Sequence, residues 1–541
     1  MCASPAMAEP EHSEFELKFS VPAEARALVF AEVTGGAGFQ GRQSLTAMYL
    51  DTPDGRLAAA GLAWRLRRES RRWVQTLKAG SSSPLQRFEH EVQRPAATPD
   101  ATLHAGTPVG DRLLALLRQA QGDGLQPEVR FRTEVRRSKR VIRTRGAVVE
   151  LAFDEGRIVA GDLQRRVLEL EFECLSGSHA AMLDLARRWQ RRFGLLLDPH
   201  SKSERGSLLA DGHLHPAVRK AATPRYPARS SAGQAFAAVL DECLDQVLRN
   251  TAGLCDGAPE QRVEHVHQLR VGLRRLRSAL RTFRAWVQPP PPALQAGLCG
   301  LFTELGRARD GDVMDSGVAT ALAAVGAPPL PPRQPAAHSE PGALLRAPAL
   351  QGLLLDLLIW RTTGYDPQLA ALPKAPGSAD TPRLADVTQA LSVLAPHAGP
   401  SAASAARRES APDSHRRRAR RRLRAWHQHI AQQARAFETL DEPSLHALRK
   451  RIKRQRYAVE FLAPLLPRRA LARYLKLLAR AQERMGELND LFVARAHYQA
   501  RVADEPAAWF ALGWLAARIA ECGAASRPAV LALAEAQPPR P

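Results

Sequence analysis

Charged and apolar side chains alternate in several short segments between residues 14 and 173. The clearest example is SEFELKFS (13–20), in which three charged residues alternate with three large apolar ones. The charged residues are Glu14, Glu16 and Lys18. Because successive side chains of a strand point to opposite faces, the segment predicts a strand with one charged and one apolar face. The charged face either meets water or lines an interior.

The same alternation returns in later segments, which are separated by turn signals such as DTPDG (51–55). The charged sets are Arg65 and Arg67; Arg87, Glu89 and Glu91; Arg130, Arg132 and Glu134; Glu150 and Asp154; and Glu169, Glu171 and Glu173. Regular short strands with turns predict an antiparallel sheet or barrel. Like charges on one face repel unless opposite charges or ions lie between them. Two alternatives remain: a sheet whose charged face is exposed to solvent, and a barrel whose charged face points inward.

An inward charged face would have a definite chemistry. Carboxylate oxygens bind hard divalent cations, and Arg and Lys side chains hold phosphate oxygens. A closed barrel of this kind is therefore expected to accept a metal-bound triphosphate.

The ordered motifs of residues 12–210 resemble the CYTH domain, also called the triphosphate tunnel metalloenzyme. EFELKF has the ExExK pattern of that family's opening strand. The later matching segments are YLDTPDGRL, WRLRRE, QTLK, RFEHEV, VRFRTEVRR, LAFDEGRI, VLELEFECLSG and SKSERG. The resemblance implies an eight-stranded antiparallel tunnel that hydrolyses or rearranges a triphosphate with Mg²⁺ or Mn²⁺.

The resemblance also implies roles for individual residues. The expected metal ligands are Glu14, Glu16, Asp154, Glu169 and Glu171. The expected phosphate ligands are Lys18, Arg65, Arg67, Lys78, Arg130, Arg132 and Lys202. Two points stay open at this stage. Glu173 shares a face with Glu169 and Glu171, and Asp154, like Glu89 and Glu91, could hold basic side chains instead of metal.

From about residue 230 the hydrophobic period changes to that of helices, rich in Ala, Leu and Arg. The Pro- and Arg-rich stretch 215–233 predicts a linker, and the Pro-rich stretches 327–343 and 395–413 predict loops. VHQLRVGLRRLRSAL, starting at 266, aligns with LHALRKRIKRQRYAV at an offset of 179 residues, and ELGRARDGDV aligns with RMGELNDLFV at an offset of 180. The helical half is therefore predicted to be a duplicated unit.

A stripe of basic residues recurs in both copies. The first stripe is His267, Arg270, Arg274, Arg277 and Arg281, and the second is His446, Arg449, Lys453 and Arg456. On a helical wheel the first stripe fills an arc of about 100° beside an apolar edge. A solvated helix face would explain one such stripe. A matching register in two copies, almost without acidic partners, favours binding of a linear polyanion.

The two copies resemble the CHAD domain over roughly residues 230–520. That resemblance implies a pair of four-helix bundles with a basic groove that binds inorganic polyphosphate. Whether His267 and His446 contact the ligand or pack between helices stays open. The fold class expected for the chain is α+β and multidomain: a β-tunnel at 12–210, a linker at 211–229 and a duplicated all-α four-helix-bundle domain at 230–520.

Composition agrees with a polyanionic partner. Lys and Arg exceed Asp and Glu by 77 − 55 = 22, and such a field attracts nucleic acid, polyphosphate or an anionic membrane. The six cysteines lack the spacing of a zinc site or a disulfide framework. No window approaches the roughly 18 apolar residues of a membrane span, and the N-terminus lacks the pattern of a signal peptide. A cytoplasmic location is expected.

The leading hypothesis is a cytoplasmic bacterial inorganic triphosphatase that releases diphosphate and phosphate. Its helical module would bind inorganic polyphosphate and could associate the enzyme with polyphosphate granules. The alternative is a polyphosphate-binding or granule-associated scaffold without catalysis. A nucleic-acid binder is a third class, but no motif for reading nucleic acid is present. Cyclic-nucleotide formation and thiamine triphosphate hydrolysis stay open within the first fold.

Overall fold

The computed structural model describes residues 13–80, 85–313, 318–328, 340–363 and 412–540. Most of the loops predicted at 327–343 and 395–413 lie outside these residues.

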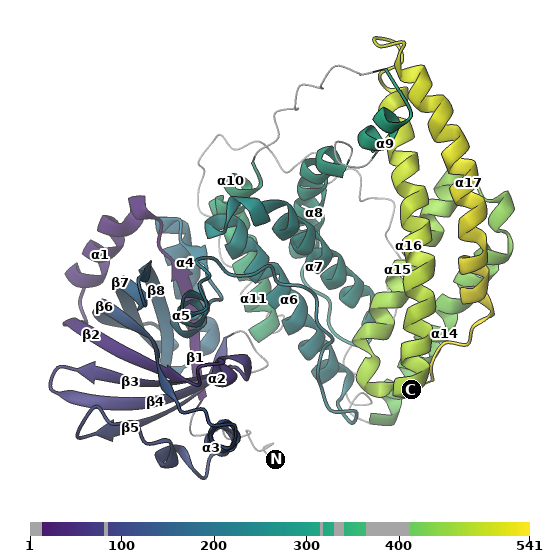
Figure 1. Ribbon diagram of the computed structural model, residues 1–541. Coiled ribbons are helices and arrows are strands. Elements are labelled where there is room, and N and C mark those ends of the chain that lie inside the picture. Colours follow the sequence, from purple (N-terminus) through teal and green to yellow (C-terminus); the bar gives the residue numbers. More distant parts are fainter. Residues whose placement is uncertain (1–12, 81–84, 314–317, 329–339, 364–411, 541) are drawn as a thin grey trace. The chain divides into compact units, whose positions relative to one another are not determined.

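Eight long strands form a closed antiparallel barrel, as the sequence predicts (Figure 1). They are β1 (Ser13–Ser20), β2 (Phe39–Asp51), β3 (Leu62–Glu69), β4 (Arg72–Gly80), β5 (Gln86–Arg94), β6 (Glu128–Arg143), β7 (Ala147–Ala160) and β8 (Leu163–Gly177). Their order is β5-β4-β3-β2-β6-β7-β8-β1, and pairing of β1 with β5 closes the wall. The two-residue strand β9 (Leu196–Leu197) adds to β1.

The strand register brings the charged faces of different strands together inside the barrel. Lys18 on β1 lies opposite Glu171 on β8, and Asp154 on β7 lies opposite Glu169. Elsewhere on the inner face of the barrel, Lys78 on β4 lies opposite Glu89 on β5. Because neighbouring residues in a ladder share a face, one charged surface runs round the interior.

The apolar faces of most strands point outward, where helices cover them. Helix α4 (His179–Phe193) covers β1 and β8: Phe15 stacks on His179 at 3.8 Å, and Phe172 meets Trp189 edge to face at 5.9 Å. Helices α2 (Arg56–Ala59) and α3 (Pro108–Gly122) pack on β3 and β4. Helix α1 (Arg26–Gly35) packs beside β2, β6 and β7. The barrel is thus polar inside and apolar outside.

Helix α5 (Lys202–Ala210) fills one end of the interior. Its Leu209 packs in an apolar cluster with Tyr49, Phe131 and Val167. At Gly206 a Cβ atom would lie 2.1 Å from the ring of Phe131, so only glycine allows this approach. The helix begins at Lys202, which faces the charged part of the tunnel.

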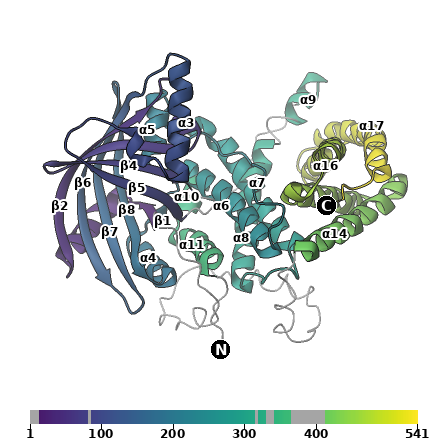
Figure 2. The same ribbon diagram turned by 90° about the horizontal axis from the view of Figure 1, so that it is seen from below.

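The remaining elements are helices. They are α6 (Ala232–Asp256), α7 (Arg262–Thr282), α8 (Pro292–Val313), α9 (Ala319–Ala324), α10 (Pro341–Arg346), α11 (Pro348–Thr363), α14 (Pro412–Arg435), α15 (Glu442–Phe461), α16 (Arg468–Gln499) and α17 (Ala508–Glu535). Helices α14 to α17 pack as a bundle, in which α15 and α17 contact both α14 and α16 (Figure 2). The aligned repeats are α7 with α15 and α8 with α16. In the described part of the chain, no helix has both the length and the apolar character that crossing a bilayer requires.

The chain divides into two compact units, and each unit is made of segments that are not consecutive in the sequence. One unit holds the barrel with Leu244–Leu269 and helices α10 and α11; there the backbone N–H of Leu197 donates to Gln351 of α11 at 2.8 Å. The other unit holds Ala221–Cys243, the chain from Arg270 through α9, and helices α14 to α17. Helices α6 and α7 each contribute to both units. The bounds 12–210, 211–229 and 230–520 stay a prediction.

A buried histidine next to α3 is held in its neutral form. His104 is fully buried, and its Nε2 lies 3.0 Å from Nε2 of Gln75. The amide of Gln75 cannot turn over, because it donates to the carbonyl of Asp100 at 2.7 Å and accepts from the N–H of the same residue at 2.8 Å. His104 Nε2 is therefore an acceptor. Burial and the neighbouring His90 lower the pKa of His104 to about 4.

We predict that the barrel loses stability as the pH falls from about 6.5 to about 4. The unfolded His104 has a pKa of about 6.5, so unfolding takes up a proton in this range, and above pH 6.5 the contribution is flat. Each such proton gives a slope of about 1.4 kcal/mol per pH unit. In calorimetric melts of the full chain, His104→Gln should reduce the pH dependence of the barrel transition, whereas the exposed His213→Gln should not. Equal pH dependence in both variants would contradict this assignment.

Candidate functional site

Three carboxylates from two neighbouring strands meet in the tunnel. They are Asp154 of β7 and Glu169 and Glu171 of β8. Their oxygens lie within 4.8 Å of one another, and the side chains of Asp154 and Glu169 are fully buried. Among the described residues they form the one group of three or more such ligands that could hold a metal ion.

Four cations surround this acidic cluster. Nζ of Lys202 lies 2.7 Å from Asp154 and 2.9 Å from Glu171 and also contacts Glu169. Arg137 of β6 donates to Asp154 at 2.6 and 2.7 Å and to Glu171 at 2.8 Å. Arg205 of α5 pairs with Glu169, and Lys18 lies 3.8 Å from the same carboxylate while donating to the carbonyl oxygen of His200. The cluster is thus neutralised from two strands and a helix.

The charges of this cluster set one another's protonation. Burial alone would raise the pKa of Glu171, but Lys202 and Arg137 hold it well below its usual range. Asp154 follows the same pattern, with Arg137 as its main partner. Burial opposes the charge of Lys202, yet the three carboxylates raise its pKa. Asp154 and Glu171 are therefore carboxylates at neutral pH.

The acidic cluster fits a divalent cation. Oxygen ligands of Mg²⁺ lie about 2.0–2.1 Å from the ion, so oxygens on opposite sides of it are about 4 Å apart. The spacing of Asp154, Glu169 and Glu171 is close to this. In addition, Arg205 holds Oε2 of Glu169 while, among the described residues, Oε1 of the same carboxylate meets only the ammonium of Lys202. Carboxylate oxygens are the ligand type that hard divalent cations prefer.

The two glutamates of the ExExK strand lie in a different part of the tunnel. Glu14 is 3.2 Å from Lys78, and Glu16 is 2.5 Å from Arg87. Lys78 also pairs with Glu89 of β5. In the metal-free protein the five expected metal ligands therefore divide into a three-carboxylate cluster and two glutamates that hold basic side chains.

Glu14 and Glu89 share a proton in this second group. Burial and the hydrogen bond to Glu89 raise the pKa of Glu14 to about 8. Burial would also raise the pKa of Glu89, but Lys78 and the bond from Glu14 lower it. At neutral pH the carboxyl group of Glu14 is therefore the proton donor and Glu89 the acceptor.

The register brings Arg65 and Arg67 into the tunnel, as expected. Arg65 lies 3.4 Å from Glu89, and Arg67 lies 3.3 Å from Glu91. Both guanidinium groups are largely buried but reach the lumen, with 12% and 15% of their side chains exposed. They line the tunnel opposite the acidic cluster's strands.

Arg130 and Arg132 do not point into the tunnel, contrary to expectation. They alternate with Phe131 and Thr133, which are buried inside the barrel. Arg130 instead donates to the carbonyl oxygen of Pro53 and to Asp211, both at 2.7 Å, and Arg132 is exposed on the outer face. The basic residue that β6 contributes to the interior is Arg137.

Sequence reasoning also missed Arg205 and Asp198, and it placed Arg87 on a charged strand face without giving it a role. Arg205 follows Lys202 by three residues, so one helical face carries both cations. The capping box that starts α5, Ser201 with Glu204, is a sequence signal for a helix at this point. Asp198 precedes that helix, and no pattern in the sequence places it beside Arg205.

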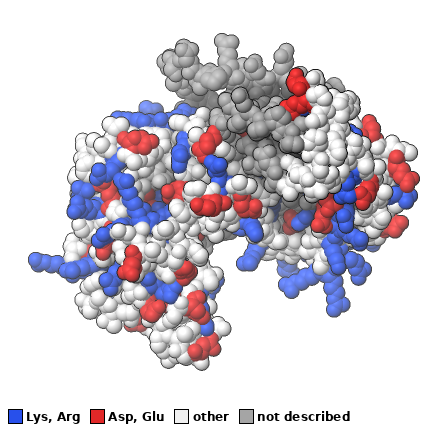
Figure 3. Space-filling view, turned by 45° about the horizontal axis from the view of Figure 1, so that its top comes forward, with Lys and Arg blue, Asp and Glu red and all other residues white. Residues whose placement is uncertain are grey.

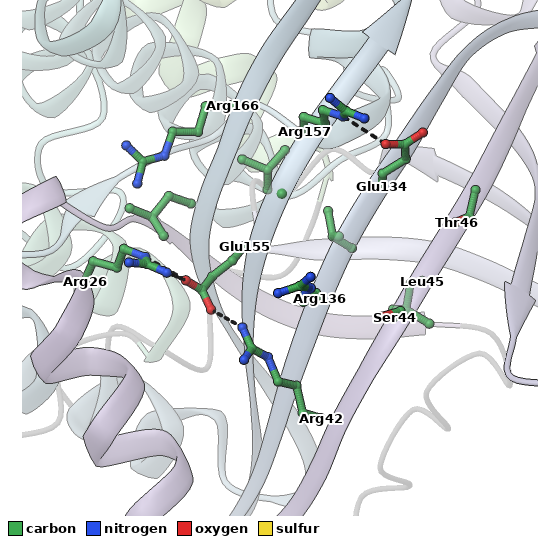
Figure 4. Close-up of a pocket in the computed structure, with 14 residues that line it drawn as sticks. Arg26, Arg42, Ser44, Leu45, Thr46, Glu134, Arg136, Glu155, Arg157 and Arg166 are labelled. Atoms are coloured by element: carbon green, nitrogen blue, oxygen red, sulfur yellow. Dashed lines mark hydrogen bonds and ion pairs between the residues drawn. The ribbon is translucent and has the colours of Figure 1, made fainter.

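A separate cavity of about 530 Å³ lies on the outer face of the barrel, over β2, β6, β7 and β8. Glu155 joins Arg26 and Arg42 there, and Arg157 pairs with Glu134 at 2.9 Å (Figure 4). These strand residues alternate with the tunnel residues and therefore point to the opposite, outer face of the barrel. They form an exposed ion-pair network and do not contact the acidic cluster.

The basic stripe on α7 is gathered round one aromatic ring. The guanidinium groups of Arg270, Arg274 and Arg277 lie 5.2, 5.5 and 5.2 Å from the ring of Phe302 on α8. Arg270 also donates to the carbonyl oxygen of Leu305 at 2.6 Å. For Arg274, Arg277 and Arg281, no ion pair exists within the described residues. The stripe thus presents several cations without acidic partners.

The stripe on α15 lies next to that on α7. Burial lowers the pKa of Arg449; Asp490 opposes this, and Arg274 adds to it. Burial likewise lowers the pKa of Arg454, and Arg281 adds to the effect. Because Arg274 repels Arg449 and Arg281 repels Arg454, the basic side chains of α7 and α15 lie close to one another. Several basic side chains project together at the lower right of Figure 3.

The other predicted residues of the two stripes are placed as follows. Nδ1 of His267 is buried and has no hydrogen-bond partner within the described part of the chain. His446 bonds to Asn489 of α16 at 2.7 Å. Arg456 pairs with Glu460 at 2.9 Å, so its charge is already compensated. Lys453 lies on α15, as do His446 and Arg456.

Two domain models match the chain: the CYTH domain over residues 12–207 and the CHAD domain over residues 238–499. The inorganic triphosphatase of Haemophilus influenzae is 28% identical over 166 residues, which are 30% of this chain and 44% of that protein. The chain thus spans less than half the length of this relative. A CHAD domain from the plant Ricinus communis is similar in structure, with 27% identity, 60% of this chain and 98% of that one covered, and a TM-score of 0.39. A putative adenylyl cyclase from Hippeastrum, described as having a dominant triphosphatase activity, has 17% identity, covers 38% of this chain and 98% of its own, and has a TM-score of 0.27.

The different positions of Arg137 and Arg132 lead to a stability prediction. Arg137→Met removes the guanidinium that Asp154 and Glu171 share and leaves Lys202 alone to compensate both carboxylates, so it should destabilise the barrel by about 3 kcal/mol. Arg132→Met removes an exposed side chain of the same type and should cost no more than about 0.5 kcal/mol. Urea unfolding followed by tryptophan fluorescence measures both. Equal losses would mean that β6 does not have the register described above.

Proposed function

The chain carries a CYTH domain followed by a CHAD domain, and from this premise we propose that its tunnel hydrolyses inorganic triphosphate to diphosphate and phosphate. The reaction would use Mg²⁺ or Mn²⁺ held by Asp154, Glu169 and Glu171. The single observation that carries this proposal is the closed barrel in which three carboxylates, two of them fully buried, face a wall of Arg and Lys side chains.

The residues of the tunnel suit an oligophosphate substrate. A bound divalent cation would neutralise phosphate charge and activate a water molecule. Arg65, Arg67 and Lys78 are positioned to bind phosphate oxygens, because each side chain is partly exposed to the lumen and carries donors beyond those used in its ion pairs. Such donors, fixed before the substrate enters, stabilise charge on the transferred and leaving phosphates, which is the main task in phosphoryl transfer.

The test is phosphate release from inorganic triphosphate with and without Mg²⁺ or Mn²⁺. ATP and thiamine triphosphate, assayed in parallel, define the substrate class. Hydrolysis that is absent with every divalent cation would contradict the proposal.

We predict that Glu171→Gln lowers metal-dependent hydrolysis by about 100-fold or more, because a metal ligand that stabilises the transition state by several kcal/mol is lost. Glu134→Gln, on the outer face, is the matched control and should retain activity within about twofold. A melting curve shows whether each variant is folded. Near-normal activity of folded Glu171→Gln would exclude this carboxylate as a ligand.

We also propose that the CHAD domain binds inorganic polyphosphate through the stripes of α7 and α15. Arg274, Arg277 and Arg281 support this proposal, since these neighbouring cations lack acidic partners in the described structure. A linear polyanion carries condensed cations, and a row of unpaired basic side chains releases those cations when it binds the polyanion. The site would include His267, Arg270, Arg274, Arg277, Arg281, His446, Arg449, Lys453 and Arg456, with domain bounds near 230–520. The same surface would allow association with polyphosphate granules.

The salt dependence of polyphosphate binding tests this surface. Changing Arg270, Arg274 and Arg277 together to Gln should flatten the log–log salt slope by about two to three, at roughly 0.7–0.9 per contact. The matched control changes the exposed Arg468, Arg469 and Arg473 of α16 to Gln and should leave the slope within about one unit of the unmodified chain. An unchanged slope in the first variant, with normal helical circular dichroism, would mean that this stripe is only a solvated face.

A further inference from the structure

Lys202 lies where the oxygens of the acidic cluster converge. Its ammonium contacts all three carboxylates, at 2.7 Å from Asp154, 2.9 Å from Glu171 and in direct contact with Glu169. These are the ligands that the proposed function assigns to a divalent cation. A side-chain cation therefore neutralises the three carboxylates of the acidic cluster.

On the two glutamates the other cations of the cluster bind different oxygens from Lys202, whereas Oδ2 of Asp154 meets both Lys202 and Arg137. Arg137 holds Oε2 of Glu171, whereas Lys202 meets Oε1. Arg205 holds Oε2 of Glu169, and again Lys202 meets Oε1. Fixed guanidinium groups therefore orient both glutamates from one side and leave the other oxygens for an exchangeable ion. A planar guanidinium fork is suited to the fixed role, and an ammonium on a flexible stem to the exchangeable one.

The backbone of Lys202 is fixed, so any exchange must come from its side chain. Ser201 and Glu204 form a capping box, with hydrogen bonds of 3.1 and 2.8 Å, at the start of α5. Gly206 lies against Phe131, and Leu209 is buried in the apolar end of the barrel. The four-carbon stem of Lys202 can rotate about this anchor without any change in the helix.

We propose that Lys202 is an exchangeable cation of the metal site. Its ammonium holds Asp154, Glu169 and Glu171 together in the metal-free protein, leaves when a divalent cation binds, and then contacts the oligophosphate in the lumen. This inference rests on the proposed function, because it takes the acidic cluster as the metal site. By linkage, metal and oligophosphate then increase each other's affinity through one side chain.

The test is Mn²⁺ binding to the full chain without any phosphate, measured by calorimetry and by electron paramagnetic resonance. Lys202→Met removes the competing cation and should tighten Mn²⁺ binding by about tenfold or more. Lys220→Met, at an exposed position, is the matched control and should have the affinity of the unmodified chain. Unchanged or weaker Mn²⁺ binding by folded Lys202→Met would overturn the proposal.

A second variant decides the matter if Lys202→Met does not fold. Lys202→Arg keeps the charge, but its bidentate fork is harder to displace, so Mn²⁺ should bind at least about fivefold more weakly than to the unmodified chain. Equal or tighter binding would overturn the proposal. Neither titration contains triphosphate, so failure of the hydrolysis assay and failure of this inference are separate results.

The coupling itself is measured with inorganic triphosphate and Ca²⁺ in place of the activating ion. In the unmodified chain, Ca²⁺ and triphosphate should each tighten the binding of the other by about tenfold. In Lys202→Met this mutual tightening should fall to about threefold or less, the part that direct attraction between Ca²⁺ and phosphate oxygens supplies. Coupling of the same size in both proteins would overturn the role of Lys202 as the link.

Discussion

Charge compensation inside a closed barrel is the constraint on which the rest of the structure depends. Removing an ion from water costs several kcal/mol unless protein partners replace its hydration. The barrel wall supplies Asp154, Glu169 and Glu171 with Arg137 and Lys18 alone, and Lys202 and Arg205 come from α5. Helix α5 therefore completes the electrostatics of the tunnel as well as filling its end.

A polar interior also determines what lies outside. Strands with charged inner faces must place their apolar residues outward, where water would meet them. Helices α3 and α4, which follow β5 and β8 in the sequence, cover these faces, and α11 packs in turn on α4. The ion pair of Arg187 with Asp356, at 3.0 Å, belongs to this contact. Helix α11, which lies in the helical half of the sequence, thus belongs to the same compact unit as the barrel. A single domain boundary in the sequence cannot describe this arrangement.

The alternation of charge predicted an antiparallel sheet or barrel, and the resemblance to the CYTH domain implied that its charged face points inward and is lined by residues that include Glu14, Lys18, Arg65 and Lys78. This expectation failed on β6 for a physical reason. At the end that α5 fills, the interior is apolar, so Phe131 and Val135 point inward there and the neighbouring arginines point outward. Further along the same strand the interior becomes charged, and Arg137 enters it. A rule that places every charged face inside cannot detect this change of polarity along one strand.

The sequence did not predict Arg205 and Asp198 as site residues for a different reason. Their partners are distant in sequence, and only the position of α5 inside the barrel brings them together.

The chain uses cations in two physically different ways. In the tunnel, Lys78, Arg65 and Lys202 are already neutralised by carboxylates, so an incoming phosphate exchanges one partner for another. On α7, cations such as Arg274 and Arg277 are neutralised by mobile ions, because no carboxylate pairs with them in the described structure. Exchange of internal partners depends weakly on salt, whereas release of condensed ions depends on it steeply. Under the proposed function, the tunnel would therefore select a short oligophosphate by the geometry of its ion pairs, while the stripe would hold a long polyanion in any register.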